Sequence, residues 1–202
     1  MKPARAHARA HWRAHVNAAP AMRIWLMDQA SLTLKLRARC QVFRVRCLHQ
    51  WRAPCLADEA GALGLPRRRH AWEREVLLEC DGAPVVFAHT VTPLEANADD
   101  WPQFSTLGER SLGSILFGDP LVRQGALQLA RLAPQHPLAQ RALAALRLHA
   151  PHLAAQLAGA QLYARRCLYR RKHGVLLVTE VFFPWLLQLP QPRPTRPQGR
   201  MG

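Results

Sequence analysis

Residues 71–92 read AWEREVLLECDGAPVVFAHTVT, and this stretch is the clearest indication of the class of fold. Two runs rich in valine, leucine and phenylalanine flank the pair Asp81-Gly82. Such a pair between two apolar runs is typical of the tight turn of a β-hairpin. We therefore expect antiparallel strands over residues 71–80 and 84–92.

Further strand patterns lie before and after this hairpin. Apolar and polar residues alternate over residues 40–51. Near the other end of the chain, residues 162–171 and 175–185 are two strand-like runs separated by a turn at His173-Gly174. Because neighbouring strands joined by short turns pair antiparallel, these segments predict one antiparallel sheet.

The segments between these strands predict helices. Asp28 or Ser31 is a suitable N-cap for a short helix that ends near Leu36. The predicted helices further along the chain are residues 108–117 and 121–158, and the glycine- and proline-containing segment 53–70 is predicted to be a loop. Together these elements predict an α+β domain whose antiparallel β-sheet is covered on one face by helices.

The chain of 202 residues is long enough for one ordinary globular domain, which we place at residues 22–189. Residues 1–21 are rich in alanine, arginine and histidine, and we expect a basic arm without fixed packing. Residues 190–202 are rich in proline and are expected to form an extended tail. The sequence contains no run of eighteen apolar residues and no apolar signal-peptide core, so we expect no membrane span and a cytoplasmic protein.

Basic residues outnumber acidic ones, with 28 lysines and arginines against 13 aspartates and glutamates and a net charge of +15. This excess favours an anionic partner. Only Lys2, Lys35 and Lys172 are lysines, and alanine and proline are abundant, so the codon bias of a GC-rich genome also explains the arginines. The strand aromatics Trp72 and Phe182 are predicted to point inward, so we expect no nucleic-acid partner and favour a small anionic ligand.

Two charged residues interrupt the apolar faces of the predicted strands. Arg74 shares its face with Trp72 and Val76, whereas the glutamates of the same strand lie on the opposite face, which we expect to contact solvent. Glu180 lies among leucine, valine and phenylalanine in the last strand. A buried guanidinium keeps its proton and needs an anion, and a buried carboxylate needs a partner or becomes protonated.

This pattern has two interpretations. Arg74 and Glu180 form a structural salt bridge, or one of them lies at an exposed strand end. Alternatively, the two charges flank a cavity and bind a ligand that has a carboxylate at one end and a hydroxyl group at the other. His89 either faces the same cavity as Arg74 or is a core histidine with satisfied hydrogen bonds.

Motifs for metals and nucleotides are missing from the sequence. It has no glycine-rich phosphate loop, no GxSxG elbow and no HExxH pair. The five cysteines form no CxxC pair, and the pair His149 and His152 has no third ligand nearby in the sequence. We therefore expect no metal and no cofactor.

Several blocks of the sequence resemble a known family in their order and spacing. WEREVLLECDGAPVVFAHTVTP, LGERSLGSILF and LLVTEVFFP are among them. These blocks are similar to the chorismate pyruvate-lyases, also called 4-hydroxybenzoate synthases, over most of residues 22–185. The blocks are residues 25–33, 72–93, 107–117, 162–174 and 176–184.

The resemblance implies a cofactor-free carbon–oxygen lyase that converts chorismate to 4-hydroxybenzoate and pyruvate for ubiquinone biosynthesis. It also implies helical flaps over an internal ligand cavity. By this resemblance, Arg74 and Glu180 are the catalytic residues: Arg74 binds the ring carboxylate of the substrate, and Glu180 contacts its 4-hydroxyl group. Backbone groups around Leu32 and Leu112 complete the carboxylate site. Leu32 stands where the family has methionine, and we interpret the long segment 118–161 as an extended helical insertion.

A non-catalytic ligand-sensing domain is the alternative function. The effector domains of some bacterial transcription regulators share this type of fold, but they follow a winged-helix DNA-binding domain. Residues 1–21 are too short for such a domain, so we favour the lyase. We expect the protein to act as a monomer.

Overall fold

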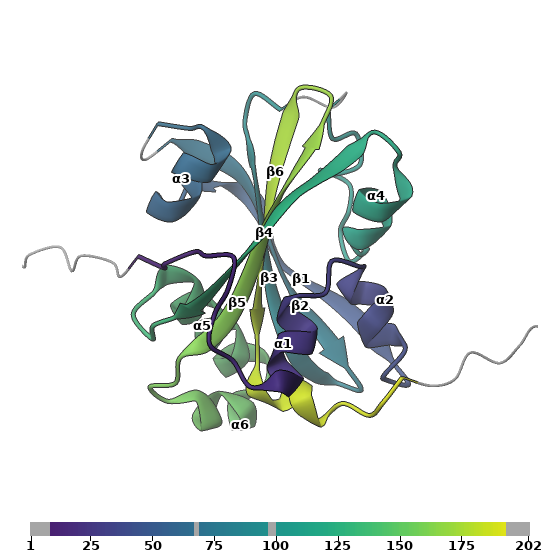
Figure 1. The fold of residues 1–202 in the computed structure, drawn as a ribbon, viewed down its shortest axis with the longest axis vertical. Coiled ribbons are helices and arrows are strands. Elements are labelled where there is room, and N and C mark those ends of the chain that lie inside the picture. The colour runs from purple at the N-terminus through teal and green to yellow at the C-terminus, as the bar shows by residue number, and fades with distance from the viewer. Residues whose placement is uncertain (1–8, 67–68, 97–99, 193–202) are drawn as a thin grey trace, which may run out of the picture.

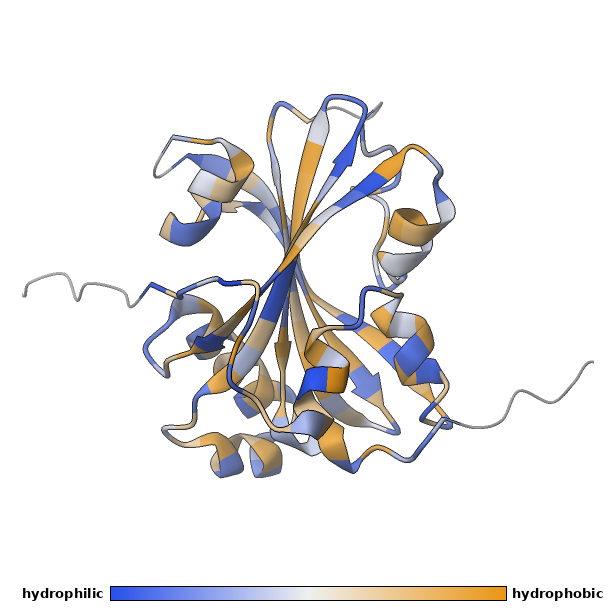
Figure 2. Ribbon diagram, in the orientation of Figure 1, coloured by the Kyte–Doolittle hydropathy of each residue, from blue (hydrophilic) through white to orange (hydrophobic). Residues whose placement is uncertain are grey.

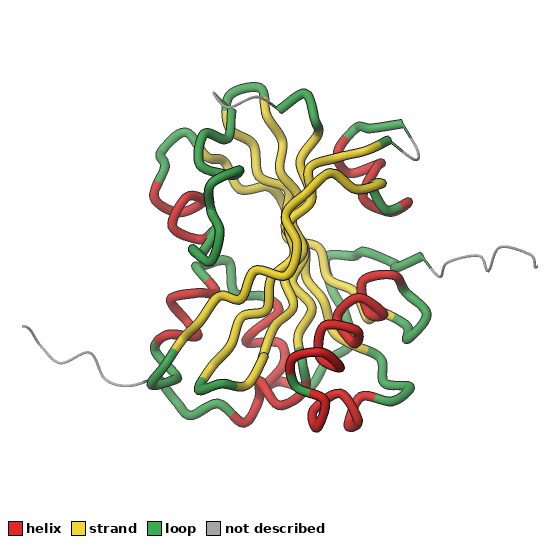
Figure 3. The backbone as a smooth tube through the Cα atoms, turned by 180° about the vertical axis from the view of Figure 1, so that it is seen from behind, coloured by secondary structure: helices red, strands yellow, loops and turns green. Residues whose placement is uncertain are grey.

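Six antiparallel strands form one strongly twisted sheet in the computed structural model, which describes residues 9–66, 69–96 and 100–192. Figure 3 shows the strands crossing at a narrow waist, with helices on either side. This arrangement confirms the α+β class and the antiparallel sheet. In spatial order the strands are β1 (Phe43–Pro54), β2 (His70–Cys80), β3 (Ala83–Pro93), β6 (Gly174–Phe182), β5 (Leu162–Arg171) and β4 (Val122–Leu132).

Both predicted hairpins are present. Asp81 and Gly82 join β2 to β3 with φ angles of 51° and 82°, the left-handed backbone that a two-residue hairpin turn requires. The carboxylate of Asp81 also accepts hydrogen bonds of 2.8 Å from the backbone N–H groups of Gln41 and Val42, which attaches the segment before β1 to this turn. The turn between β5 and β6 contains Lys172, whose φ angle is 50°.

Helices pack on both faces of the sheet, whereas the sequence predicts them on one face. Figure 1 shows α2 and α4 on one side of the twisted sheet and α3 and α5 on the other. Ser31 is the N-cap of α2, as predicted, and its hydroxyl accepts a hydrogen bond of 3.4 Å from the N–H of Leu34. The helices are α1 (Pro20–Leu26), α2 (Leu32–Arg37), α3 (Ala57–Leu63), α4 (Gly113–Gly118), α5 (Pro137–His149) and α6 (Pro151–Ala154), with 3-10 turns at Ala155–Leu157 and Pro184–Gln188.

The helix predicted over residues 121–158 is wrong in its first part, because β4 occupies Val122–Leu132. This segment is rich in leucine and alanine, which favour helices, but pairing with β5 overrides that weak preference. Close approach of the two strands is possible at Gly125, where a Cβ atom would lie 2.8 Å from the carbonyl oxygen of Leu168. The helical prediction holds from Pro137 onward.

The loop predicted over residues 53–70 contains α3. The carboxylate of Glu59 accepts a hydrogen bond of 3.2 Å from the backbone N–H of Leu56, which satisfies a free donor at the start of this helix. Gly64 ends the helix with a φ angle of 70°. The glycines that suggested a loop therefore lie inside and at the end of a short helix.

Residues 9–19 pack against the domain and do not form the unpacked arm that the sequence predicts. Arg13 exchanges backbone hydrogen bonds of 3.0 and 2.7 Å with Leu129, so this segment covers the edge of the sheet at β4. The indole N–H of Trp12 donates a hydrogen bond of 2.8 Å to Asp58. The rest of the predicted arm, residues 1–8, and most of the predicted tail, residues 193–202, lie outside the described residues.

The core lies between the sheet and the helices. Figure 2 shows hydrophobic residues along the strands and, interspersed with hydrophilic ones, in the helices. Phe87, Phe182 and Phe183 are among the largest fully buried side chains. Among the described residues, no helix combines the length and the apolar character that crossing a membrane requires.

Candidate active site

A partly enclosed cavity lies between one face of the sheet and the short helices α2 and α4. All six strands contribute to its wall, which is largely apolar, and most of the lining residues of the sheet lie on β2, β3, β5 and β6. Arg74, Arg165 and Glu180 add charged groups to this wall. The apolar residues that line the cavity from the strands include Val76, Leu78, Ala88 and Val178.

Arg74 is a buried cation, as its position in the sequence predicts. Its side chain projects from β2 and the residue is 2% exposed. Its Nη2 donates hydrogen bonds of 2.8 and 2.9 Å to the carbonyl oxygens of Gly108 and Arg110, and its Nε has no hydrogen-bond partner among the described residues. Burial lowers the pKa of Arg74, and no carboxylate opposes that shift. Within the described part of the chain, the guanidinium therefore has a free donor and lacks a counter-ion.

Glu180 lines the same cavity from β6 and has a different partner. Its carboxylate accepts a short hydrogen bond from Nε of Arg165, the residue opposite it on β5. Nη1 of Arg165 donates to the carbonyl oxygens of Trp25, at 2.9 Å, and of Asp28. Burial alone would lower the pKa of Arg165, but the charge of Glu180 and its hydrogen bond, with smaller contributions from Tyr169 and Asp28, together outweigh burial and raise it. Arg165 thus gives Glu180 a counter-charge and ties the connection between α1 and α2 to the sheet.

These contacts exclude the structural salt bridge between Arg74 and Glu180. Each residue is held by its own partners, and β3 lies between their two strands. The side chains share one face, because Arg74 pairs with Thr90 and Glu180 pairs with Ala88, two positions apart on β3. A buried cation and a carboxylate therefore lie on the same wall of one cavity.

Leu32 and Leu112 also line the cavity, at the starts of the two helices that cover it. A hydrogen bond of 2.5 Å between the hydroxyl groups of Thr33 and Ser111 joins these helices. The contact is tight, because a Cβ atom on Gly113 would lie 3.1 Å from the hydroxyl of Ser31. The structure therefore brings all four sequence-predicted site residues to one cavity.

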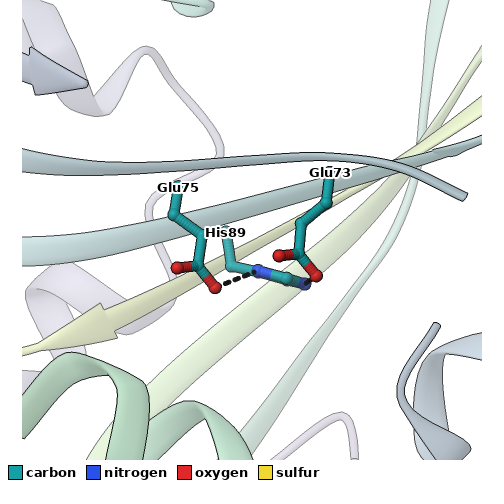
Figure 4. A group of neighbouring side chains, drawn as sticks. All are labelled: Glu73, Glu75 and His89. Carbon is teal, nitrogen blue, oxygen red and sulfur yellow. Dashed lines mark hydrogen bonds and ion pairs between the residues drawn. The ribbon is translucent and has the colours of Figure 1, made fainter. Parts of the chain in front are cut away.

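His89 does not face this cavity, so that interpretation of the sequence is wrong. It pairs with Glu75 on β2, one position away from the pair that contains Arg74, so its side chain points to the opposite face. Figure 4 shows Glu73 and Glu75 directed toward its imidazole ring. The prediction that the glutamates of β2 contact solvent is also wrong, because Glu73 is 4% exposed. Helices α3 and α5 cover this face, which the sequence pattern did not reveal.

Glu73, Glu75 and His89 place potential metal-ligand atoms within 4.8 Å of one another. Positive charges already balance these carboxylates. The guanidinium of Arg141 donates hydrogen bonds of 2.8 and 2.7 Å to Glu73 and Glu75. Burial alone would lower the pKa of His89, but Glu59, Glu75 and Glu73 outweigh burial and raise it to about 10. This group is therefore best described as a network of ion pairs.

Sequence reasoning missed Arg165. In the segment LYARRCLYRR, alternation places Arg165 on the same face as Cys167 and Tyr169, both of which line the cavity. The test that identified Arg74, which is a charge on an otherwise apolar strand face, also identifies Arg165.

Residues 6–189 match the family model that is described as chorismate lyase. The match covers most of the chain and includes every residue of the cavity discussed above. The chain belongs to the chorismate lyase family.

Curated relatives agree with this assignment. A protein of Ralstonia nicotianae named probable chorismate pyruvate-lyase is 48% identical over 162 residues, which cover 80% of this chain and 80% of that relative. A protein of the same name from Cupriavidus pinatubonensis is 45% identical over 183 residues, covering 91% of this chain and 87% of the relative.

Among solved structures, the effector domain of PhnF from Mycobacterium smegmatis has a similar fold. The two structures align with a TM-score of 0.51 and a sequence identity of 16%. The alignment covers 78% of this chain and 90% of the PhnF domain. At this identity the similarity shows the fold alone.

Proposed function

We propose that this protein is a chorismate pyruvate-lyase that converts chorismate to 4-hydroxybenzoate and pyruvate without a cofactor. The observation that supports this most strongly is the placement of Arg74 and Glu180 on one cavity wall, each with its own partners. The proposed substrate is a ring with a carboxylate at one end and a hydroxyl group at the other. Such a molecule complements a cation and a carboxylate that are held apart.

Arg74 is proposed to bind the ring carboxylate. Its buried guanidinium has no carboxylate partner among the residues that the structure describes, so a substrate carboxylate supplies the counter-ion that burial requires. The resulting hydrogen bonds are charge-assisted and stronger than those between neutral groups. Leu32 and Leu112 border the cavity where α2 and α4 begin, and their backbone is proposed to complete this end of the site.

Glu180 is proposed to accept a hydrogen bond from the 4-hydroxyl group and to orient the ring. The reaction breaks the bond between C3 and the ether oxygen, while the hydrogen on C4 leaves as a proton and the electron pair of that C–H bond completes the aromatic ring. The electron pair of the C–O bond leaves with the enolpyruvyl group, which takes up a proton and becomes pyruvate. Arg165 keeps the carboxylate of Glu180 fixed in position throughout.

Because aromatisation supplies much of the driving force, the protein needs mainly to hold one reactive conformer and to exclude water. The cover formed by α2 and α4 serves both purposes. The net charge of +15 favours the approach of an anion. A closed site that fits the aromatic product also slows its release. We further propose that the monomeric protein acts in the cytoplasm and supplies 4-hydroxybenzoate for ubiquinone biosynthesis.

The test is to incubate purified protein with chorismate in the presence of a chelator and to measure 4-hydroxybenzoate and pyruvate separately. We expect both products in equal amounts. Binding of 4-hydroxybenzoate without any turnover of chorismate would instead identify a ligand-sensing domain. Formation of neither product, together with no binding, would refute both functions.

A further inference from the structure

A buried group of charges lies on the face of the sheet opposite the cavity. We call it the back cluster, and it consists of Glu59 of α3, Glu73 and Glu75 of β2, His89 of β3 and Arg141 of α5. Glu59, Glu73 and His89 are buried. Figure 4 shows Glu73 and Glu75 extending from the same strand toward opposite ends of the His89 ring. The chemistry proposed above involves none of these residues.

Arg141 joins the two carboxylates of β2. A single nitrogen, Nη1, donates to Glu73 at 2.8 Å and to Glu75 at 2.7 Å. The imidazole of His89 lies beneath the same pair, with Nδ1 3.2 Å from Glu75 and Nε2 2.9 Å from Glu59. Glu75 is therefore held by both Arg141 and His89, and Glu73 is held by Arg141, with Nε2 of His89 3.9 Å away.

The position of these anchors relative to Arg74 is the important feature. Glu73 and Glu75 are its immediate neighbours in β2, and side chains alternate between the two faces of a strand. Fixing both neighbours on the back face fixes the peptide groups on either side of Arg74. The direction in which Arg74 leaves the strand toward the cavity is then fixed as well.

We propose that Arg141 is a positioning residue for Arg74 and that α5 supports the substrate site from behind the sheet. This inference rests on the proposed function, in which Arg74 binds the ring carboxylate. Helix α5 is held by the buried residues Leu138, Ala142 and Leu146, so Arg141 extends from a fixed element. Loss of its guanidinium leaves Glu73 and Glu75 close together without their shared donor, and their mutual repulsion shifts β2 at Arg74.

The experiment compares wild-type protein with Arg141→Met and Arg141→Lys. Arg147→Met is the matched control, because Arg147 lies on the same helix, is exposed and has no ion pair with a described carboxylate. Affinities are measured for 4-hydroxybenzoate and for its neutral analogue 4-hydroxybenzamide. Only the first ligand offers a carboxylate to Arg74.

Arg141→Met is expected to weaken 4-hydroxybenzoate binding about five- to tenfold, which lies within the range of coupling between members of one charge network. Binding of 4-hydroxybenzamide should stay within about twofold of wild type. Arg141→Lys should keep most of the preference for 4-hydroxybenzoate over 4-hydroxybenzamide, because one ammonium group is able to bridge the carboxylates of Glu73 and Glu75. In an Arg74→Ala background, Arg141→Met has no further effect on the ratio of the two affinities. A residue that only stabilised the fold would weaken both ligands equally.

Equal losses for both ligands, unchanged selectivity, or the same loss in the Arg74→Ala background each overturn the inference. Should Arg141→Met fail to fold, Glu75→Gln provides the same comparison, because it keeps the shape of the side chain and removes the ionic bridge. Absence of chorismate turnover in the wild type refutes the proposed function. Carboxylate selectivity that is independent of Arg141 refutes only the positioning role.

Discussion

Arg74 of β2 and Glu180 of β6 lie on the same wall of one cavity and are bound by different partners. Arg74 donates to the carbonyl oxygens of Gly108 and Arg110, whereas Glu180 accepts from Arg165. Because neither charge neutralises the other, the cavity has a cationic and a carboxylate group for two ends of a ligand.

Replacement of Arg74 is expected to impair substrate binding severely. Arg74→Ala removes the buried cation and should reduce kcat/KM for chorismate about a hundredfold or more, as truncation of one member of a buried charge pair does. Steady-state kinetics measure this effect. Arg123→Ala, at an exposed position on β4, is the control and should leave kcat/KM unchanged. Equal activity of the two variants would contradict the role assigned to Arg74.

Glu180→Gln tests the carboxylate while keeping its shape. The variant should lower kcat more than it raises KM, because the proposed contact orients the 4-hydroxyl group in the reacting complex. Since Arg165 then lacks its counter-ion, a second change of Arg165 to Gln should cost less activity in the Glu180→Gln background than in the wild type. Additive effects of the two substitutions would show that the residues act independently.

Arg165→Met is expected to destabilise the fold by about 3 kcal/mol, since it breaks a buried ion pair and leaves Glu180 without its counter-charge. It also removes the hydrogen bonds to Trp25 and Asp28 that hold the connection between α1 and α2. Urea denaturation measures the change. A loss below about 1 kcal/mol, the size typical of an exposed pair, would mean that the pair contributes little to stability.

Thr33→Val removes the hydroxyl contact between the two helices that cover the cavity. If these helices retain the product, 4-hydroxybenzoate should dissociate about fivefold faster, which corresponds to loss of one net hydrogen bond. Stopped-flow displacement measures the dissociation rate. Ser105→Ala, at an exposed site, is the control. An unchanged rate in Thr33→Val would show that the product leaves by another route.

The back cluster predicts a dependence of stability on pH. The pKa of His89 is raised from 6.5 to about 10. The protonated imidazole therefore contributes fully to the free energy of unfolding below about pH 6.5, and this contribution is lost as the pH rises through about 10. Between these two pH values, the free energy of unfolding of the wild type should fall by up to about 1.4 kcal/mol per pH unit relative to that of His89→Gln.

At low pH, the back cluster makes the protein less stable as the pH falls, which is the opposite direction. Burial alone would raise the pKa of Glu75, but His89 and Arg141 outweigh burial and lower it to about 2. The ionised carboxylate of Glu75 therefore contributes to the free energy of unfolding above about pH 4.5, and this contribution is lost as the pH falls toward 2. Urea denaturation across both ranges checks the two directions, and parallel curves for wild type and His89→Gln would contradict them.

Local signals were sufficient for every strand except β4 and for two of the site residues. Alternation and turn chemistry identified β2, β3, β5 and β6 together with their hairpins, and charges on apolar faces identified Arg74 and Glu180. Leu32 and Leu112 came only from the family resemblance, because a leucine at the start of a helix carries no chemical signal of its own.

The remaining features depend on contacts between distant segments. Residues 122–132 have a helix-favouring composition and become a strand only because β5 lies beside them. The sequence pattern predicted that Glu73 contacts solvent, because its ion-pair partner Arg141 is 68 residues away in the sequence. Composition and periodicity do not report which helix will cover a given face of the sheet.

A crystal structure of the protein with bound 4-hydroxybenzoate tests the central claim most directly. The predicted complex has the carboxylate within about 3 Å of the Arg74 guanidinium and the hydroxyl oxygen at a similar distance from Glu180. A product molecule bound in the reverse orientation, or outside the cavity with Arg74 still lacking an anion, would contradict the account.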